Sequence, residues 1–182
     1  QSNSTGVVQM GPYPFLTDIV ITISNNQDVN CVINSNPIQL FACPPENDNC
    51  NGAIEAVVNA DQSCSLTTQG TLSGASYSGN ESGCLADMDD DVWFSFSASS
   101  QVQTISIQNI SGSTSNLGHA LYVGTGDVLC STLEELYCVN ETTSVSPDLT
   151  IGVTYHIRIF SIGDESQNVE FDLCISDAPD NT

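Results

Sequence analysis

The residues best suited to chemistry lie in an acidic stretch that leads directly into a hydrophobic segment. Asp87, Asp89, Asp90 and Asp91 place four carboxylates within five consecutive positions. Carboxylates this close repel one another unless water, salt or a cation screens them. An all-oxygen cluster suits a hard cation, above all Ca²⁺, although the spacing is not that of an EF-hand loop. The stretch predicts a calcium site, and the alternative interpretation is a solvated acidic turn.

Residues for nucleophilic or acid–base catalysis are scarce. The two histidines are His119 and His156, and no GxSxG motif marks a nucleophilic serine. His156 falls within an expected strand beside Arg158, which is the pattern of a surface cross-strand pair. Nothing in so acidic a chain singles out two carboxylates for glycoside hydrolysis. The sequence therefore predicts a protein that is not an enzyme.

Aromatic side chains offer a second kind of site. Carbohydrate-binding modules use exposed rings on a flat sheet face, and the main candidates here are Trp93, Tyr77 and Tyr122. The competing interpretation is that these rings belong to the core, because a lone tryptophan on a central strand is usually packed.

The charge of the chain excludes several classes of partner. Among 182 residues there are 22 Asp and Glu against one Lys or Arg, and the formal net charge is −21. Binding to nucleic acid or to an anionic membrane surface requires basic groups that are missing. No apolar run reaches the length of about 18 residues needed to insert into a membrane. A length of 182 residues suffices for one domain, or for one domain with an extension.

Eight cysteines predict four disulfides formed in an oxidising, extracellular compartment. Eight cysteines allow about 105 pairings, so connectivity rests on weaker arguments. Short loops favour two pairs, and the remaining cysteines complete the set. The expected bridges are Cys130–Cys138, Cys31–Cys43, Cys64–Cys84 and Cys50–Cys174.

Period-2 alternation of apolar side chains predicts an all-β domain. Val92, Phe94 and Phe96 alternate with Trp93 and serines, as in a half-buried strand. Further strands are expected at short, regular spacing over residues 53–59, 65–77, 103–109, 120–123, 133–139, 154–162 and 169–175. No amphipathic helix is available to connect parallel strands, so the expected fold is an antiparallel, jelly-roll-like β-sandwich.

The N-terminal segment, residues 1–43, is expected to be an extension ahead of the sandwich at residues 44–176, with residues 177–182 as an acidic tail or linker. Pro44 and Pro45 stiffen the junction. A strand is expected over residues 16–24, and a hairpin over 29–34 and 38–43 around the sequence NSNP. The first strand is apolar on both faces and would expose an unpaired edge if left alone.

Two outcomes are open for that strand: it packs on its own domain, or it inserts into a neighbouring copy by strand addition. The residues expected to mediate self-association are Leu16, Ile19, Val20, Ile21 and Ile23.

Several weak motifs in a fixed order carry a family resemblance. The sequences PPENDNCNGAI, CLADMDDDVWFSF, ALYVGTG, LEELYC, GVTYHIRI and EFDLCIS span residues 44–176. Together they resemble the pre-peptidase C-terminal-like (PPC-like) β-sandwich of secreted Bacteroidetes-type bacterial proteins. The resemblance implies a calcium-binding, jelly-roll-like module appended to secreted proteases, hydrolases and adhesins. It also implies the metal ligands, namely Glu46, Asn47 and Asp48 together with Asp87, Asp89, Asp90 and Asp91. Residues 1–43 have no counterpart in such a domain.

These features predict a secreted, non-catalytic protein of the cell surface or of an extracellular appendage. We expect structural or adhesive work by a self-associating filament or surface-layer subunit, stabilised by calcium and disulfides, whose partners are copies of itself. The alternative is a carbohydrate- or substrate-binding accessory module of a secreted hydrolase, which would bind surface glycans. Polymer state discriminates the two, since a binding module stays monomeric.

Overall fold

The computed structural model describes residues 18–25, 28–39, 43–79, 83–84, 89–124, 130, 132–163 and 165–178. The chain divides into two compact units, residues 1–42 and residues 43–182, each of which is described by itself. No helix in the described ranges is both long and apolar enough to cross a membrane.

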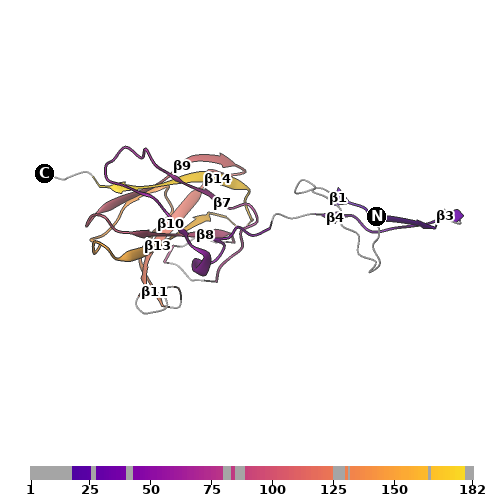
Figure 1. Cartoon of the computed structure of the whole chain (residues 1–182), viewed down its shortest axis with the longest axis horizontal. Coiled ribbons are helices and arrows are strands. Elements are labelled where there is room, and N and C mark those ends of the chain that lie inside the picture. The colour runs from indigo at the N-terminus through magenta and orange to yellow at the C-terminus, as the bar shows by residue number, and fades with distance from the viewer. Residues whose placement is uncertain are drawn as a thin grey trace. The chain divides into compact units, whose positions relative to one another are not determined.

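The second unit is a two-layer β-sandwich (Figure 1). The first sheet has the order β11 (Leu133–Val139), β10 (Leu117–Gly124), β13 (Thr154–Ser161), β8 (Asp91–Ser97) and β5 (Ile54–Glu55). The second has the order β12 (Thr143–Val145), β9 (Gln103–Gly112), β14 (Val169–Asp177) and β6 (Val58–Asn59), and β7 (Thr68–Thr71) also pairs with β14. The predicted all-β, disulfide-bonded sandwich is confirmed.

The core lies between the two sheets and follows the predicted alternation. Phe94 on β8 and Ile157 on β13 point inward from the first sheet, and Ile107 on β9 does so from the second. Phe94 meets Phe171 of β14 edge to face, with ring centroids 6.1 Å apart. Aromatic pairs of this geometry are worth about 0.5–1.5 kcal/mol beyond the area they bury.

Two short strands depart from the prediction of antiparallel pairing throughout. β5 pairs with β8, and β6 pairs with β14, both in parallel. The single strand predicted over residues 53–59 is therefore two short strands, β5 in the first sheet and β6 in the second. The segment passes from one layer of the sandwich to the other between them. Parallel pairing is possible here without a crossover helix because the connection only needs to touch the sheet edges.

β12, which alternation did not predict, is a short polar strand. Its Val145 is exposed, and its register places Ser144 opposite Ile105 of β9. A strand with no inward apolar series leaves no period-2 signal.

The outer face of the first sheet is covered, so β8 is not the half-buried strand that alternation predicted. Trp93, Tyr122 and Phe160 form a second hydrophobic cluster there with Cys50 and Ala120. The covering segment includes the short 3-10 helix η1 (Cys50–Gly52), and the Trp93 amide donates to the Asn47 carbonyl at 2.8 Å.

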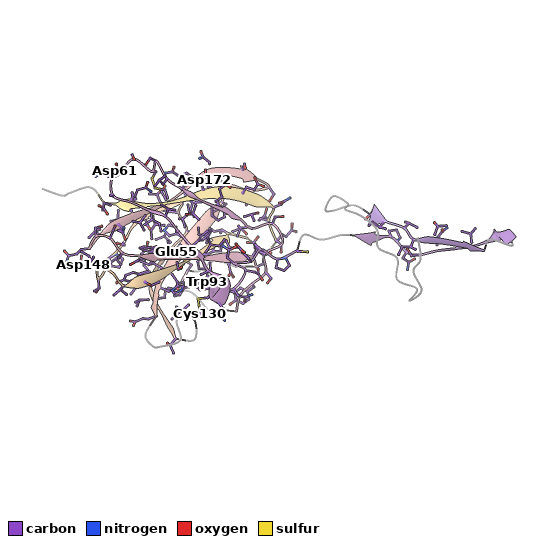
Figure 2. The ribbon with its side chains drawn as sticks, viewed as in Figure 1. Glu55, Asp61, Trp93, Cys130, Asp148 and Asp172 are labelled. Atoms are coloured by element: carbon purple, nitrogen blue, oxygen red, sulfur yellow. A yellow bond between two sulfur atoms is a disulfide. The ribbon has the colours of Figure 1, made fainter. Side chains whose placement is uncertain are left out.

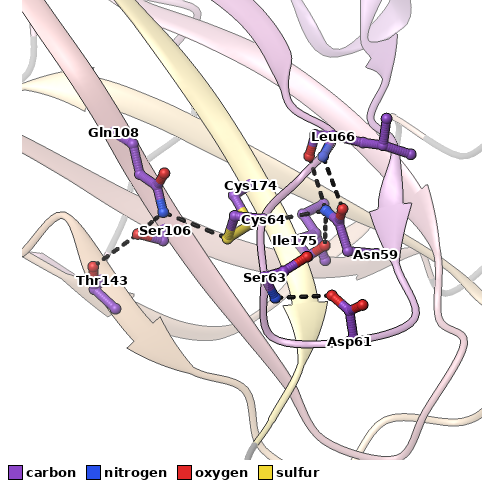
Figure 3. Close-up of a disulfide and its surroundings, with 10 residues drawn as sticks. All are labelled: Asn59, Asp61, Ser63, Cys64, Leu66, Ser106, Gln108, Thr143, Cys174 and Ile175. Atoms are coloured by element: carbon purple, nitrogen blue, oxygen red, sulfur yellow. Dashed lines mark hydrogen bonds between the residues drawn. A yellow bond between two sulfur atoms is a disulfide. The ribbon is translucent and has the colours of Figure 1, made fainter.

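Two disulfides, Cys64–Cys174 and Cys84–Cys138, tie loop residues to β14 and β11, and a third, Cys50–Cys130, joins η1 to the turn at residue 130. The loop from Asn59 to Leu66 lies over β14 where Cys64 meets Cys174, and Asn59 donates to the carbonyls of Leu66 and Ile175 at 2.8 and 3.0 Å (Figure 3).

The predicted pairs Cys130–Cys138, Cys50–Cys174 and Cys64–Cys84 are wrong. Five residues of β11 lie between Cys130 and Cys138, and an extended strand of that length spans about 17 Å. Cys50 and Cys174 belong to opposite outer faces, with the core between them. The argument from short loops failed because the bridges join segments 54 to 110 residues apart.

The predicted Cys31–Cys43 bridge is not formed. The Cys43 thiol is free and exposed, and the side chain of Cys31 lies outside what the structure describes.

The first unit contains one long antiparallel ribbon rather than a strand followed by a separate hairpin. β2 (Thr22–Asn25) pairs with β3 (Asp28–Asn34), and β1 (Asp18–Ile19) pairs with β4 (Ile38–Gln39). The predicted hairpin around NSNP is therefore wrong. Instead, the strand partner of β3 is β2, with Asn25 opposite Asp28.

Candidate functional site

The candidate site is a cavity of about 460 Å³ in the sandwich unit. Four parts of the chain line it: residues 45–47, strand β5, strand β7, and the paired strands β9 and β14. The lining residues are Pro45, Glu46, Asn47, Ile54, Gln69, Gly70, Thr71, Asn109, Ser111, Glu170, Phe171 and Asp172. A volume of this size suits a small molecule or one to two sugar rings.

Four polar side chains in this cavity make no hydrogen bond within the described part of the chain. Glu46, Gln69, Ser111 and Glu170 are exposed, and none has a hydrogen-bond partner within the described part of the chain. Two carboxylates, an amide and a hydroxyl therefore present donors and acceptors to whatever occupies the cavity.

A β-bulge positions a fifth polar group. The β9–β14 register shifts between Glu170 and Asp172, and Asn109 in the bulged strand has a left-handed φ of 50°. Asparagine tolerates this conformation better than most residues, and bulges re-aim side chains. The Asn109 amide donates to Asp172 Oδ2 at 2.7 Å, so this pair is held ready at the cavity wall.

The apolar part of the cavity depends on a glycine. A Cβ on Gly70 would lie 2.4 Å from the Phe171 ring, so β7 can pass this close to Phe171 only without a side chain. Half-buried Ile54 and Pro45 add apolar surface.

The structure places the predicted metal residues in three different surroundings. Glu46 and Asn47 line the cavity, and Asn47 also donates to the Trp93 carbonyl at 2.9 Å. Asp48 accepts hydrogen bonds from the amide and hydroxyl of Ser76, at 2.6 and 2.8 Å.

Asp90 and Asp91 are fully buried and their carboxylates are already occupied. Asp90 accepts bonds from Ser161 and from the Gln167 amide, and burial raises the pKa of the Asp90 carboxyl above its ordinary value despite those bonds. Asp91 receives Arg158 at 2.6 Å and the Trp93 indole at 3.0 Å.

Asp89 has one buried oxygen, Oδ1, without a hydrogen-bond partner in the described ranges, and Asp87 lies outside them. The one metal-like group that the described residues form is Cys50, Cys130 and His156, and its two sulfurs are joined in a disulfide. Calcium binding stays a prediction.

The predicted aromatic platform is not assembled on the surface. Trp93 and Tyr122 are buried, with ring centroids 5.3 Å apart, and only Tyr77 of the three candidates is exposed, at 48%. Trp93 and Cys130 belong to the cluster on the outer face of the first sheet, and Figure 2 shows Asp172 on the opposite side of the sandwich unit from Cys130.

Arg158 and His156 are buried rather than paired at the surface as predicted. Arg158 is 0% exposed and lies 5.4 and 5.8 Å from the ring centroids of Tyr77 and Trp93. The only Lys or Arg of the chain is therefore part of the packing of the first sheet.

Sequence reasoning missed a polar trio built on His119. His119 Nε2 lies 2.6 Å from Ser144 Oγ, which lies 2.7 Å from the Tyr137 hydroxyl, and His119 Nδ1 donates to the Glu141 carbonyl at 2.9 Å. Burial lowers the pKa of His119 to about 4, so the ring is neutral at pH 7. None of these residues lines the cavity, and the trio joins β10 and β11 to β12 of the other sheet. No local motif announces it, because its members come from three strands.

Comparison with known protein families gives a match to the sandwich unit. A family profile described as galactose binding domain-like, and associated with T9SS, matches residues 46–173. No curated protein matches the sequence. The match supports a Bacteroidetes-type extracellular β-sandwich with a non-catalytic binding fold, whereas the narrower PPC-like assignment stays a prediction. The matched residues cover both sheets of the sandwich and most of the cavity wall, and the chain belongs to the T9SS-associated, galactose-binding-domain-like family.

Proposed function

We propose that this chain is a non-catalytic, glycan-binding accessory module of a secreted bacterial protein, and that the glycan occupies the cavity between β7, β9 and β14. The observation that carries the proposal is the set of uncommitted side chains, Glu46, Gln69, Ser111 and Glu170, around a cavity of about 460 Å³. The family match supports the same class of function.

The chemistry of the wall fits a sugar. Carboxylate and amide groups bind vicinal hydroxyls, while the less polar face of a pyranose ring packs on apolar surface such as that of Ile54 and Pro45. The Asn109–Asp172 pair is ordered before any ligand arrives, which reduces the entropic cost of binding.

Affinity gel electrophoresis and calorimetry against neutral galactose-containing oligosaccharides test the proposal. Gln69→Ala and Glu170→Ala are expected to weaken binding at least fivefold, because each removes a hydrogen bond worth about 1 kcal/mol. Glu134→Ala serves as the matched control, since Glu134 is exposed on β11 and does not line the cavity. Failure of every neutral glycan to bind, or an equal loss in the control, would contradict the proposal.

A second function, self-association through the N-terminal ribbon, is supported by its exposed surface. Within the described residues each ribbon strand has one strand partner, and Val20, Ile21 and Val32 are exposed. A two-stranded ribbon is marginally stable alone, and its open edges are templates for another strand. We propose that the edges pair with those of a second copy. Of the residues predicted for this role, Leu16 and the Ile23 side chain lie outside the described part.

Light scattering of the whole chain and of a deletion lacking residues 1–42 tests self-association. We expect the whole chain to be oligomeric or filamentous and the deletion to be monomeric. Val20→Lys with Ile21→Lys should disperse the oligomer while leaving the sandwich folded. A whole chain that is monomeric at high concentration refutes the idea.

A further inference from the structure

The molecule has no exposed basic side chain with which to bind an anion, because its one Arg and both His residues are buried. The single Lys or Arg of the sequence, Arg158, is 0% exposed and is bonded to Asp91. His119 and His156 are buried as well, and burial lowers the pKa of both rings, so neither offers a positive charge at pH 7. Any anionic group that approaches the sandwich meets a chain of net charge −21 without an available basic side chain.

The cavity wall has acidic side chains and lacks basic ones. Glu46, Glu170 and Asp172 contribute three carboxylates to its wall, and no basic side chain is among the lining residues. The one partner that these carboxylates have in the described part of the chain is the neutral amide of Asn109, which orients Asp172 without compensating its charge. The charges of these carboxylates are therefore not neutralised by the described part of the chain, and they can interact with a ligand in the cavity.

Charge must then influence which glycan binds. A uronate or sulfate in the cavity would stand beside like charges, whereas an ammonium group would gain an attractive contact. Carboxylates at the surface are partly screened, so each favourable or unfavourable contact is expected to change affinity by about fivefold.

We propose, on the basis of the glycan site proposed above, that the cavity selects its ligand by charge. It favours hexosamine units with a free amino group, accepts neutral sugars, and rejects glycans that carry carboxylate or sulfate.

Three oligosaccharides of equal length, which differ in the charge of their substituents, test the selection. These are a glucosamine oligomer with free amines, its N-acetylated form, and an oligouronate, each titrated calorimetrically into the whole chain at about 0.15 M salt. The expected order of affinity is amine, then neutral, then acid, with about fivefold between neighbours. A linear polyamine of matched charge is expected to bind more weakly than the glucosamine oligomer, because it has no sugar ring to fill the cavity.

Variants separate the cavity from the general charge of the protein. Glu46→Gln and Glu170→Gln are expected to erase most of the preference for the amine-bearing oligosaccharide over its neutral N-acetylated form. Glu134→Gln and Asp148→Asn remove the same charge from exposed positions away from the cavity and should leave the preference intact. An equal loss in these controls, or equal binding of the polyamine, would mean that only diffuse charge attracts cations.

The outcomes distinguish this inference from the proposed function. Binding of the neutral oligosaccharide without any order by charge overturns the inference and leaves the glycan site standing. Binding of the acidic oligosaccharide as tightly as the neutral one does the same. Failure of all three oligosaccharides to bind overturns the inference, whereas the proposed function falls only if the neutral galactose-containing oligosaccharides also fail to bind.

Discussion

Two groups of carboxylates in this protein have opposite surroundings. Asp90 and Asp91, from the densest acidic stretch, are buried and bonded to Ser161, Gln167, Trp93 and Arg158. Glu46 and Glu170 are 124 positions apart in the sequence, yet they line one cavity and have no hydrogen-bond partner in the described part. The difference teaches that local density of charge does not mark a binding site, because a carboxylate is available to a ligand only where the fold leaves it without a donor.

The largest loss of stability is expected from removing a partner of the buried carboxylates Asp90 and Asp91. Arg158→Ala leaves the Asp91 carboxylate buried without its cation, although the Trp93 indole and the Ser78 amide still donate to it. Loss of one partner of a buried ion pair costs about 3–5 kcal/mol, measurable by urea denaturation. An Asp91→Asn, Arg158→Met double variant should recover part of this loss, and a cost below 1 kcal/mol for Arg158→Ala would show that the pair is not structural.

Acid titration should affect folding through the buried groups rather than the cavity. The unfolded chain protonates His119 near pH 6.5, whereas the folded chain does so only near its lowered pKa of about 4. The stability that this neutral histidine contributes is full above pH 6.5 and falls by about 3 kcal/mol as pH drops to 4. Burial lowers the pKa of His156 in the same sense, while the raised pKa of Asp90 acts in the opposite sense, because protonation of Asp90 favours the folded state.

Denaturation curves measured between pH 7 and pH 4 check this dependence. His119→Gln should lower stability at pH 7 and flatten the curve in the same interval. An unchanged slope in the variant would show that other groups govern acid unfolding.

Calcium binding would change the comparison between the buried and the cavity carboxylates. A bound metal would make the acidic stretch at Asp89 to Asp91 a ligand site as well as a structural one. If Asp89 and its neighbours hold Ca²⁺, a free concentration ten times the dissociation constant adds about 1.4 kcal/mol to the free energy of unfolding. Thermal unfolding at about 0.15 M salt, with calcium and then with a chelator, measures this. An unchanged midpoint means that the Arg158 ion pair and the hydrogen bonds to Asp90 and Asp91 hold the stretch without a metal.

The smallest effect on stability is expected at the cavity. Glu46→Gln and Glu170→Gln remove exposed charges without described partners, so each should change the free energy of unfolding by no more than about 0.5 kcal/mol. Urea denaturation of both variants beside Arg158→Ala tests the contrast. A loss above 2 kcal/mol in either would show that these carboxylates support the fold.

Part of the candidate site could be predicted from the sequence. The family resemblance predicts Glu46 and Asn47 as calcium ligands; both residues line the cavity, and metal binding by them stays a prediction. Asn109, Glu170 and Asp172 carried no signal, because a bulge and the pairing of β9 with β14 bring them there. Trp93 was read as a possible surface ring, and its burial depends on η1 and the Cys50–Cys130 bridge, which alternation along β8 does not encode.

The sequence by itself determined most strands of the sandwich and the all-β class, and its net charge predicts that anionic partners are disfavoured. Alternation at positions such as Val92, Phe94 and Phe96 is a local property, and net charge needs no coordinates at all. The tertiary structure alone decided the disulfide pairs, the covered face around Trp93, the trio at His119 and the cavity. Each of these joins residues from separate strands, and which of them meet depends on sheet order, register and bulges, which are set by packing over the whole sandwich.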